Sequence, residues 1–401
     1  MNEQAIRVSA ILAYFMRVED VRRERELQAH SGVEFTFCIR EDGSAALTRY
    51  SGSGEVIEIP AAYEGHPVTE IGEYAFACSE DARRVIVPEG VAAIGEGAFG
   101  SCTGLREIVL PESLRRLGAQ CFADCASLEE LTLPLLTENV PEGMCRGCGS
   151  LRQVLLPLFL PEEDAALGAS AFCECMKLER IVIPEGVVKI GGMAFFNCSS
   201  LKEVALPATL TEIGNSAFAF CRELERIELP EKVQRLGVQP FLHCEKLQEV
   251  SLPAALTVAE ENPFGGCVSL AQVHIAAGNP VFAIEGDFLV NVQKAQALSY
   301  LAGREAAFAI VPVNIRRLSD HVFTGSRRLT SVTLLEGVET IGNAAFSACK
   351  RLRRVALPGT LERIGRDLFD GCSGVALEAP EGTLAAEYAM KKRASLISLE
   401  E

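Results

Sequence analysis

Apolar and polar positions repeat along most of this chain with a period of 23 residues. Three consecutive copies read IPEGVVKIGGMAFFNCSSLKEV (183–204), LPATLTEIGNSAFAFCRELERI (206–227) and LPEKVQRLGVQPFLHCEKLQEV (229–250). A period of this length cannot come from a helix or a strand and indicates stacked structural repeats. Because one unit is too short to bury its own apolar face, burial must come from the coils before and after it. The pattern therefore predicts a solenoid.

Within one coil, the segment LREIVLP (105–111) predicts a short strand. Alternation along a strand directs Ile108 and Leu110 inward and leaves Glu107 and Val109 outward. The proline ends the strand, and the AF..C stretch that follows predicts a turn or short helical segment that places its phenylalanine in the core. Strands of successive coils would stack in parallel about 4.8 Å apart. We therefore expect an open, mainly β solenoid of about thirteen coils.

Three segments flank the array. Residues 1–32 predict a helical extension outside the repeat, because their apolar residues recur at helical spacing. Residues 33–76 predict an N-terminal cap with a first coil, in which the Asp42-Gly43 dipeptide signals a β-hairpin. Residues 380–401 predict a helix and a last strand that close the stack.

The array itself, residues 77–379, is interrupted twice. An irregular coil is expected at 140–172, where the distance between successive prolines grows by four residues. The second interruption, at 279–312, alternates apolar residues and predicts a β-hairpin inserted into a coil.

Composition limits the partners. The formal net charge is −16, which argues against nucleic acid and anionic membranes, since both need a basic patch. No apolar stretch reaches the length of a membrane span, and no secretory signal is recognisable at the N-terminus. We therefore expect a monomer in the cytoplasm that meets other proteins, with an extracellular or cell-surface location as the alternative.

The fifteen cysteines follow the repeat. Most of them stand three residues after the phenylalanine position, where neighbouring coils would stack them as small buried hydrophobic residues. We expect free thiols, in agreement with a reducing compartment. Three successive coils carry extra cysteines, so that six thiols could come within reach of a zinc ion; the alternative is that small residues fill space there. These six are Cys121, Cys125, Cys145, Cys148, Cys173 and Cys175.

The repeat pattern, roughly LxxIxLPxxLxxIGxxAFxxCxx, is matched most fully at 178–267. Together with the edge segments TRYSGSGEVIEIP, NPVFAIEGDFLV and AAEYAMKKRASLISL, it resembles the bacterial BspA-like leucine-rich repeats, and the resemblance covers about residues 34–400. It implies a leucine-rich-repeat solenoid of the α/β class, a right-handed curved stack with a parallel sheet on its concave face. It also implies protein–protein or adhesive interactions. Many members are secreted or surface-attached, whereas this chain shows no convincing signal, anchor or wall-sorting segment.

Chemistry of catalytic type is not apparent. The five histidines fall at unrelated phases of the repeat, and no Walker loop, HExxH or GxSxG motif occurs. We expect neither enzymatic activity nor a cofactor, and interpret the chain as a protein-binding or scaffolding module. A cell-surface adhesion component is the alternative, and a thiol- or zinc-responsive protein a weaker one.

The candidate binding face consists of outward strand positions in four successive coils. Their second members, from 109 to 182, form an apolar strip on a sheet otherwise edged by charge, and exposed apolar patches mark interfaces. The alternative is that β-branched residues simply suit strands. The expected site residues are Glu107, Val109, Glu130, Thr132, Gln153, Leu155, Arg180 and Val182.

Overall fold

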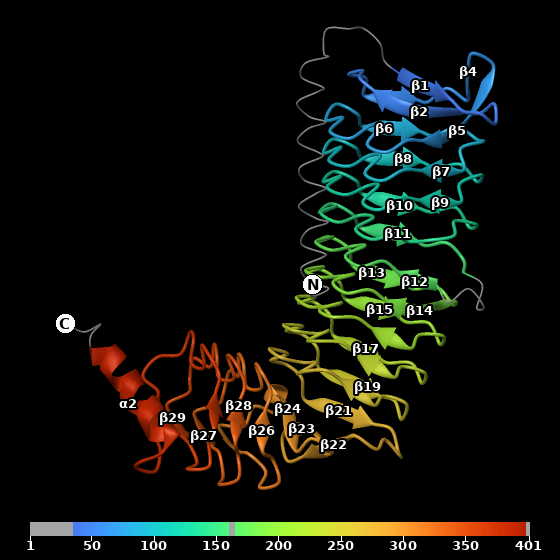
Figure 1. Cartoon of the computed structure of the whole chain (residues 1–401). Coiled ribbons are helices and arrows are strands. Elements are labelled where there is room, and N and C mark those ends of the chain that lie inside the picture. The colour runs from blue at the N-terminus through green and yellow to red at the C-terminus, as the bar shows by residue number, and fades with distance from the viewer. Residues whose placement is uncertain (1–34, 160–164, 398–401) are drawn as a thin grey trace. The chain divides into compact units, whose positions relative to one another are not determined.

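The structure is a computed structural model of the 401-residue chain and describes residues 35–159 and 165–397. These residues form two compact units, one ending at Leu210 and the other beginning at Thr211 (Figure 1). Both are stacks of β coils, with about 14 turns in all, and the predicted parallel β solenoid is confirmed. The expected helical extension, residues 1–32, lies outside the described residues.

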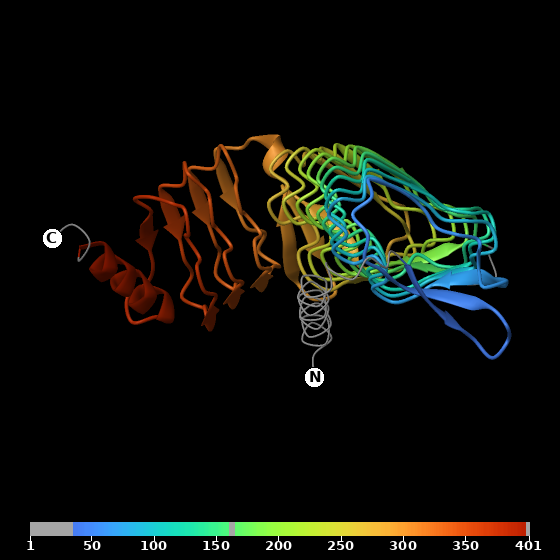
Figure 2. The same ribbon diagram turned by 90° about the horizontal axis from the view of Figure 1, so that it is seen from above.

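Each coil of the first unit contributes one short strand just before its proline position, and we call this series the front row. A second strand later in the coil belongs to the back row. Seen from above, these coils lie over one another (Figure 2). The front row is β3 (Val56–Glu58), β6 (Arg84–Ile86), β8 (Glu107–Val109), β10 (Glu130–Thr132), β11 (Gln153–Leu155), β13 (Arg180–Val182) and β15 (Glu203–Ala205). The back row is β5 (His66–Ile71), β7 (Ala93–Ile94), β9 (Arg116–Leu117), β12 (Ala165–Leu167) and β14 (Val187–Ile190).

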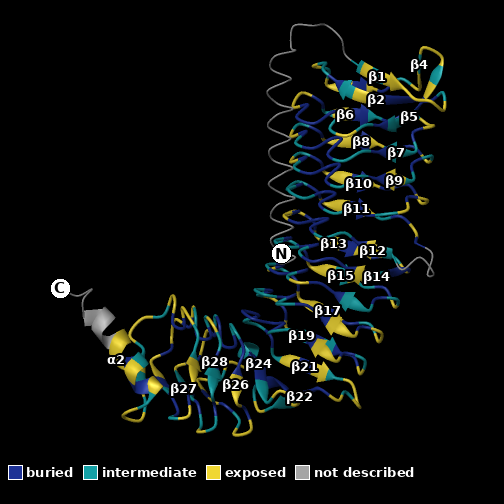
Figure 3. Ribbon diagram, in the orientation of Figure 1, coloured by how far each residue is buried: buried dark blue, intermediate teal, exposed yellow. Residues whose placement is uncertain are grey.

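Side-chain alternation explains the front row. Its middle residue points inward, as Ile108 does in β8, while Glu107 and Val109 face solvent (Figure 3). Pairing is parallel, for example Arg84 opposite Glu107. The back row depends on the glycine that follows it, because a Cβ at Gly118 would lie 2.4 Å from the backbone nitrogen of Glu96 in the previous coil. Only glycine permits the coils to approach this closely.

The core is a column of stacked phenylalanine rings. In the first unit Phe76 and Phe99 lie 4.9 Å apart between ring centroids, and Phe172 and Phe195 lie 5.4 Å apart. In the second unit Phe218 and Phe241 are 5.5 Å apart and nearly parallel. All of these rings are fully buried, which is why the phenylalanine positions set the phase of the repeat.

The N-terminal cap closes this column. Strands β1 (Phe35–Ile39) and β2 (Ala45–Tyr50) pair antiparallel around the Asp42-Gly43 turn, where we expected a hairpin. Tyr50 stacks on Phe76 at 4.9 Å and so continues the ring column into the cap. The short strand β4 (Ala62–Tyr63) pairs with β5.

The second unit repeats the two rows. Its front row is β17 (Arg226–Glu228), β19 (Glu249–Leu252), β21 (Gln272–Ile275), β25 (Phe308–Ile310), β27 (Ser331–Thr333), β29 (Arg354–Ala356) and β31 (Ala376–Glu378). Its back row is β16 (Glu212–Ile213), β18 (Arg235–Leu236), β20 (Val258–Ala259), β26 (Arg317–Leu318), β28 (Thr340–Ile341) and β30 (Arg363–Ile364).

Between β21 and β25 the regular ladder stops, in the segment where we expected an inserted hairpin. Strands β22 (Phe282–Glu285), β23 (Phe288–Asn291) and β24 (Gln296–Tyr300) pair antiparallel, and β24 then joins β26 of the back row. A 3-10 turn, η2 (Ala302–Arg304), follows. Its Arg304 side chain donates hydrogen bonds to the carbonyl oxygens of Ala271 and Gly286, so a side chain bridges the place where a strand pair is missing.

Helix α2 (Leu384–Ile397) follows β31 at the C-terminal end of the array. Ala385 and Ala386 are buried, and Ala385 belongs to the core of the second unit. The helix continues to Ile397, and the rest of the segment expected to form a helix and a strand, residues 398–401, lies outside the described residues.

Candidate protein-binding face

The eight expected site residues all lie on the solvent side of four front-row strands in the first unit. Glu130 stands opposite Gln153, and Thr132 opposite Leu155, because β10 and β11 pair in register. The neighbouring strands pair elsewhere: β8 with β6, and β13 with β15. Among the described strands, the eight residues therefore share one face without forming one continuous hydrogen-bonded sheet.

Charges on this face are partly neutralised across the strands. Arg84 lies 3.2 Å from the carboxylate of Glu107, and Arg180 lies 2.8 Å from that of Glu203. Both pairs are exposed, so each contributes little to stability. The last residue of each of these strands also faces solvent, and at this position Leu155 and Val182 expose hydrocarbon.

Sequence reasoning missed three leucines that enlarge this surface. Leu135 and Leu136 follow β10, and Leu158 follows β11. The backbone N–H of Leu158 donates to the carbonyl oxygen of Leu135 at 3.2 Å, so the two turns are stacked in adjacent coils. Because β11 and β13 also adjoin, we group five side chains as the apolar patch, each between 50% and 67% exposed. They are Leu135, Leu136, Leu155, Leu158 and Val182.

The repeat does contain a feature that could have revealed these exposed leucines. The residue after the proline is glutamate in several coils, and its carboxylate accepts a hydrogen bond from the next coil. Glu89 accepts from the N–H of Glu112 at 3.1 Å, and Glu185 accepts from that of Ala208 at 2.9 Å. Leu135 and Leu158 occupy this position without any such acceptor. Two coils therefore replace a hydrogen-bonding residue by exposed hydrocarbon.

The second unit carries a smaller exposed apolar group that the sequence analysis also missed. Phe308 and Ile310 are the outward residues of β25, and Val313 follows the proline of the same coil. Phe308 is 70% exposed. These three positions have the same repeat phase as Gln153, Leu155 and Leu158, which makes the group a natural comparison for the apolar patch.

The cysteine cluster of the first unit is buried in the stack. Thiols three residues after the phenylalanine position donate to main-chain oxygens: Cys125 donates to Phe99, and Cys148 to Phe122, both at 3.1 Å. Burial raises the pKa of the Cys173 thiol to about 12, which favours the protonated form. Among the described residues no group of three or more cysteine, histidine or acidic side chains could hold a metal ion. The zinc hypothesis thus finds no support in the described part of the chain.

The fold and the face define a class of protein, the leucine-rich-repeat solenoids. The family described as BspA type leucine rich repeat region matches residues 57–161, 165–285 and 307–394 with six copies, and the chain belongs to this family. The family resemblance inferred from the repeat is thereby confirmed.

Solved structures show the same fold. A leucine-rich repeat protein from Bacteroides ovatus ATCC 8483 is 23% identical, with a TM-score of 0.56 over 89% of this chain and 96% of that one. A leucine rich cell surface protein from Faecalibacterium prausnitzii A2-165 is 22% identical, with a TM-score of 0.53 over 90% and 96%. The comparison with curated proteins found no match.

None of the described helices combines the length and the apolar character that crossing a membrane would require.

Proposed function

We propose that this chain binds a protein partner through the solvent side of the front-row strands of its first unit, with the apolar patch at the centre of the contact. The observation that carries the proposal is the exposure of Leu135, Leu136, Leu155, Leu158 and Val182 on adjoining coils. Side chains of this kind favour burial by about 25 cal/mol per Å² of apolar surface. Solenoids present extended surfaces of neighbouring coils, which suits recognition of a protein.

The role proposed is that of a binding or scaffolding module without enzymatic activity. Membership of a repeat family whose units stack as a scaffold supports this reading. Polar and charged side chains flank the patch, including Glu130 and the Arg180–Glu203 pair. An apolar centre with a polar rim is the usual anatomy of a protein interface.

A cell-surface adhesion role is the second candidate. The F. prausnitzii protein of the same fold is described as a cell surface protein, and this favours the alternative location over the cytoplasmic one. The cytoplasmic location that we favoured from the sequence has no support in the comparisons. Free cysteines are also a weak argument for it, because most are buried and shielded from oxidants wherever the protein resides.

In the test, the full-length protein is immobilised and the proteins that it captures are cross-linked to it. Mass spectrometry then identifies these proteins, and the cell fraction from which each one comes is recorded. A Leu155→Glu/Val182→Glu double variant should lose its specific partner, since charge replaces exposed hydrocarbon at the patch. Its thermal unfolding should match that of the wild type, because both side chains are exposed.

Ile310→Glu is the matched control, an exposed apolar residue at the same repeat phase in the second unit. Capture lost in the double variant and kept in the control supports the proposal. Unchanged capture by the folded double variant, or loss only in Ile310→Glu, would place the interface elsewhere.

A further inference from the structure

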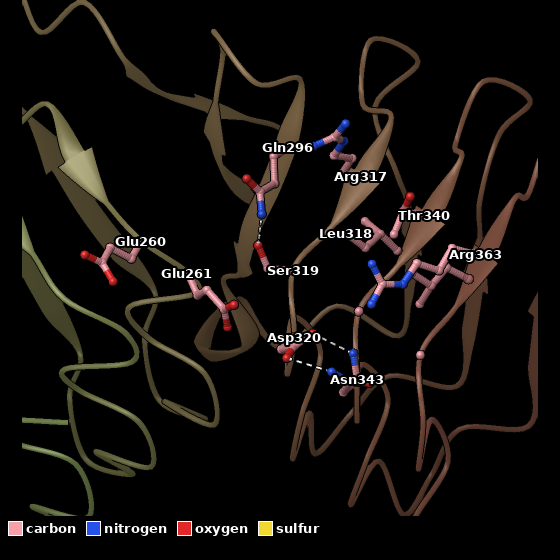
Figure 4. A pocket seen from close by; sticks show the side chains of 13 residues that line it. Glu260, Glu261, Gln296, Arg317, Leu318, Ser319, Asp320, Thr340, Asn343 and Arg363 are labelled. Carbon is pink, nitrogen blue, oxygen red and sulfur yellow. Dashed lines mark hydrogen bonds between the residues drawn. The ribbon is translucent and has the colours of Figure 1, made fainter. Parts of the chain in front are cut away.

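A pocket of about 320 Å³ opens in the second unit (Figure 4). It arises from the hairpin insertion. The chain leaves β20 at Glu260 and Glu261, passes through the antiparallel strands, and returns to the back row at β26. The residues after β20 form one wall, and the strands β26, β28 and β30 form the other.

The first wall holds a carboxylate without a partner. At this repeat phase a side-chain oxygen often accepts the N–H of the next coil: Asp320 accepts from Asn343 at 2.6 Å, and Asn343 from Arg366 at 3.0 Å. Among the described residues, Glu261 makes no such bond and no ion pair. Burial raises the pKa of the Glu261 carboxyl, and the nearby charge of Asp320 raises it further. A cation between the two acids would favour the ionised carboxylate and so lower the pKa of Glu261 again.

The opposite wall holds unpaired guanidinium groups. Arg317, Thr340 and Arg363 stand opposite one another on β26, β28 and β30. By contrast, Arg316, next to Arg317 in the sequence, forms an ion pair with Glu339. Within the described chain, neither Arg317 nor Arg363 has a carboxylate partner. Figure 4 shows the guanidinium of Arg363 extending from its strand toward Leu318, and Arg363 lines the same pocket as Glu261 and Asp320.

The two walls are held together by a buried amide. Asn262, next to Glu261, is completely buried, and its Nδ2 donates to the backbone oxygen of Asp320 at 3.0 Å. Its Oδ1 accepts from the N–H of Phe264 and from the hydroxyl of Ser299 in β24. The spacing between the walls is therefore set before any ligand arrives, which lowers the cost of binding.

We propose that this pocket binds a small zwitterion, such as an α-amino acid or a dipeptide. Its ammonium group lies at Glu261 and Asp320, and its carboxylate lies at Arg363. A guanidinium presents two parallel donors to a carboxylate, whereas an ammonium group donates to several carboxylate oxygens at once. The volume lies in the range of small-molecule sites. This site is independent of the proposed protein-binding face.

The experiment is calorimetric titration of the full-length protein with glycylglycine. Two blocked analogues serve as comparisons: N-acetylglycylglycine lacks the ammonium group, and glycylglycinamide lacks the carboxylate. The expected result is saturable binding of glycylglycine, weakened at least tenfold by either block. Glu261→Gln should abolish the advantage of the ammonium group, and Arg363→Gln the advantage of the carboxylate.

Arg366→Gln is the control, because Arg366 is an exposed arginine three residues after Arg363 that does not line the pocket. It should bind glycylglycine as the wild type does. No saturable binding of glycylglycine, equal affinity for the three ligands, or full affinity in folded Glu261→Gln would each overturn the proposal.

Discussion

The thiol of Cys125 donates a hydrogen bond to the main-chain oxygen of Phe99, one coil earlier, at 3.1 Å. The same contact recurs along the stack, for example from Cys244 to Phe218 and from Cys372 to Phe346. It ties the cysteine of these coils to the phenylalanine of the preceding coil, whereas Cys175 donates to Cys145, which stands at the phenylalanine position. The spacing of the two residues in the repeat is thus a hydrogen-bonding requirement as well as a matter of size.

Removing one of these thiols should therefore have a measurable cost. Cys125→Ala should lower the free energy of unfolding by about 1–2 kcal/mol, from a lost hydrogen bond and a small cavity. Urea titration provides the measurement. Cys38→Ala, at an exposed cysteine, is the control and should change little. Equal effects of the two substitutions would show that the hydrogen bond from Cys125 to Phe99 contributes nothing to the free energy of unfolding.

The cysteines should be free but unequally reactive. Alkylation under denaturing, non-reducing conditions should label all fifteen, since none is paired among the described residues. In the native protein Cys38 should react first because it is exposed, the half-buried Cys372 should follow, and the thirteen buried cysteines should react only on unfolding. Peptide mass spectrometry distinguishes the sites. Protected pairs after denaturation would contradict the expectation.

The ring column predicts a large effect at its centre. Phe218→Ala should cost about 3–5 kcal/mol, because it removes a fully buried ring and leaves a cavity beside Phe241. Phe308→Ala is the matched control, since that ring is largely exposed, and its cost should stay near zero. A denaturant titration that finds less than about 1 kcal/mol for Phe218→Ala would remove this ring from the core.

Residues at one position of the repeat have a positive φ, and a substitution by glycine there should stabilise the protein. Glu174 has a φ of +63° and is exposed, and the preceding coil has Gly147 at the same phase with a φ of +76°. Glu174→Gly should raise the free energy of unfolding by roughly 0.5–1 kcal/mol by relieving strain. Gly147→Ala should lower it, because the new Cβ would lie 2.2 Å from Oδ1 of Asp124. Thermal unfolding of both variants checks the opposite signs.

Two histidines should make the second unit sensitive to mild acid. Burial lowers the pKa of His243 and of His321 below 6.5, and the charge of His321 lowers that of His243 further. The acids facing them, Glu245 and Asp320, oppose this only in part. The folded state thus prefers neutral imidazoles, so stability is complete above pH 6.5 and declines as the pH falls through the folded pKa values.

The check is the pH dependence of urea unfolding between pH 7 and 5. The His243→Gln/His321→Gln variant should lose less stability over this interval than the wild type. A wild-type decline as shallow as that of the variant would exclude these groups as its cause.

The fold could be predicted because each side chain's environment is set by its phase in the repeat. Phe218 is buried for the same reason as Phe241, and Val109 points outward for the same reason as Val182. The leucines at 135 and 158 were missed because they depart from the repeat, and a consensus conceals departures. The zinc hypothesis finds no support among the described residues, and proximity of cysteines in the repeat does not tell which way each sulfur points.

The pocket could not be predicted from sequence at all. An insertion separates Glu261 from Arg363 in the sequence, and the path of this insertion decides whether both residues line one pocket. The periodicity carries no information about that path. The eight residues of the front face were placed by alternation along the strand, and the structure puts them on the solvent side, while their role in binding stays a proposal.

The hydrogen bonds from each coil's amides and thiols to its neighbour give this protein a natural unit of length. Removing one period of 23 residues from the regular array would join two surfaces that already fit, because Gly95, Gly118 and Gly191 each approach the backbone of the preceding coil in the same way. A deletion of any other size would misalign phenylalanine, cysteine and glycine together. Deletion or duplication of one period would therefore shorten or lengthen the stack of coils in steps of about 4.8 Å.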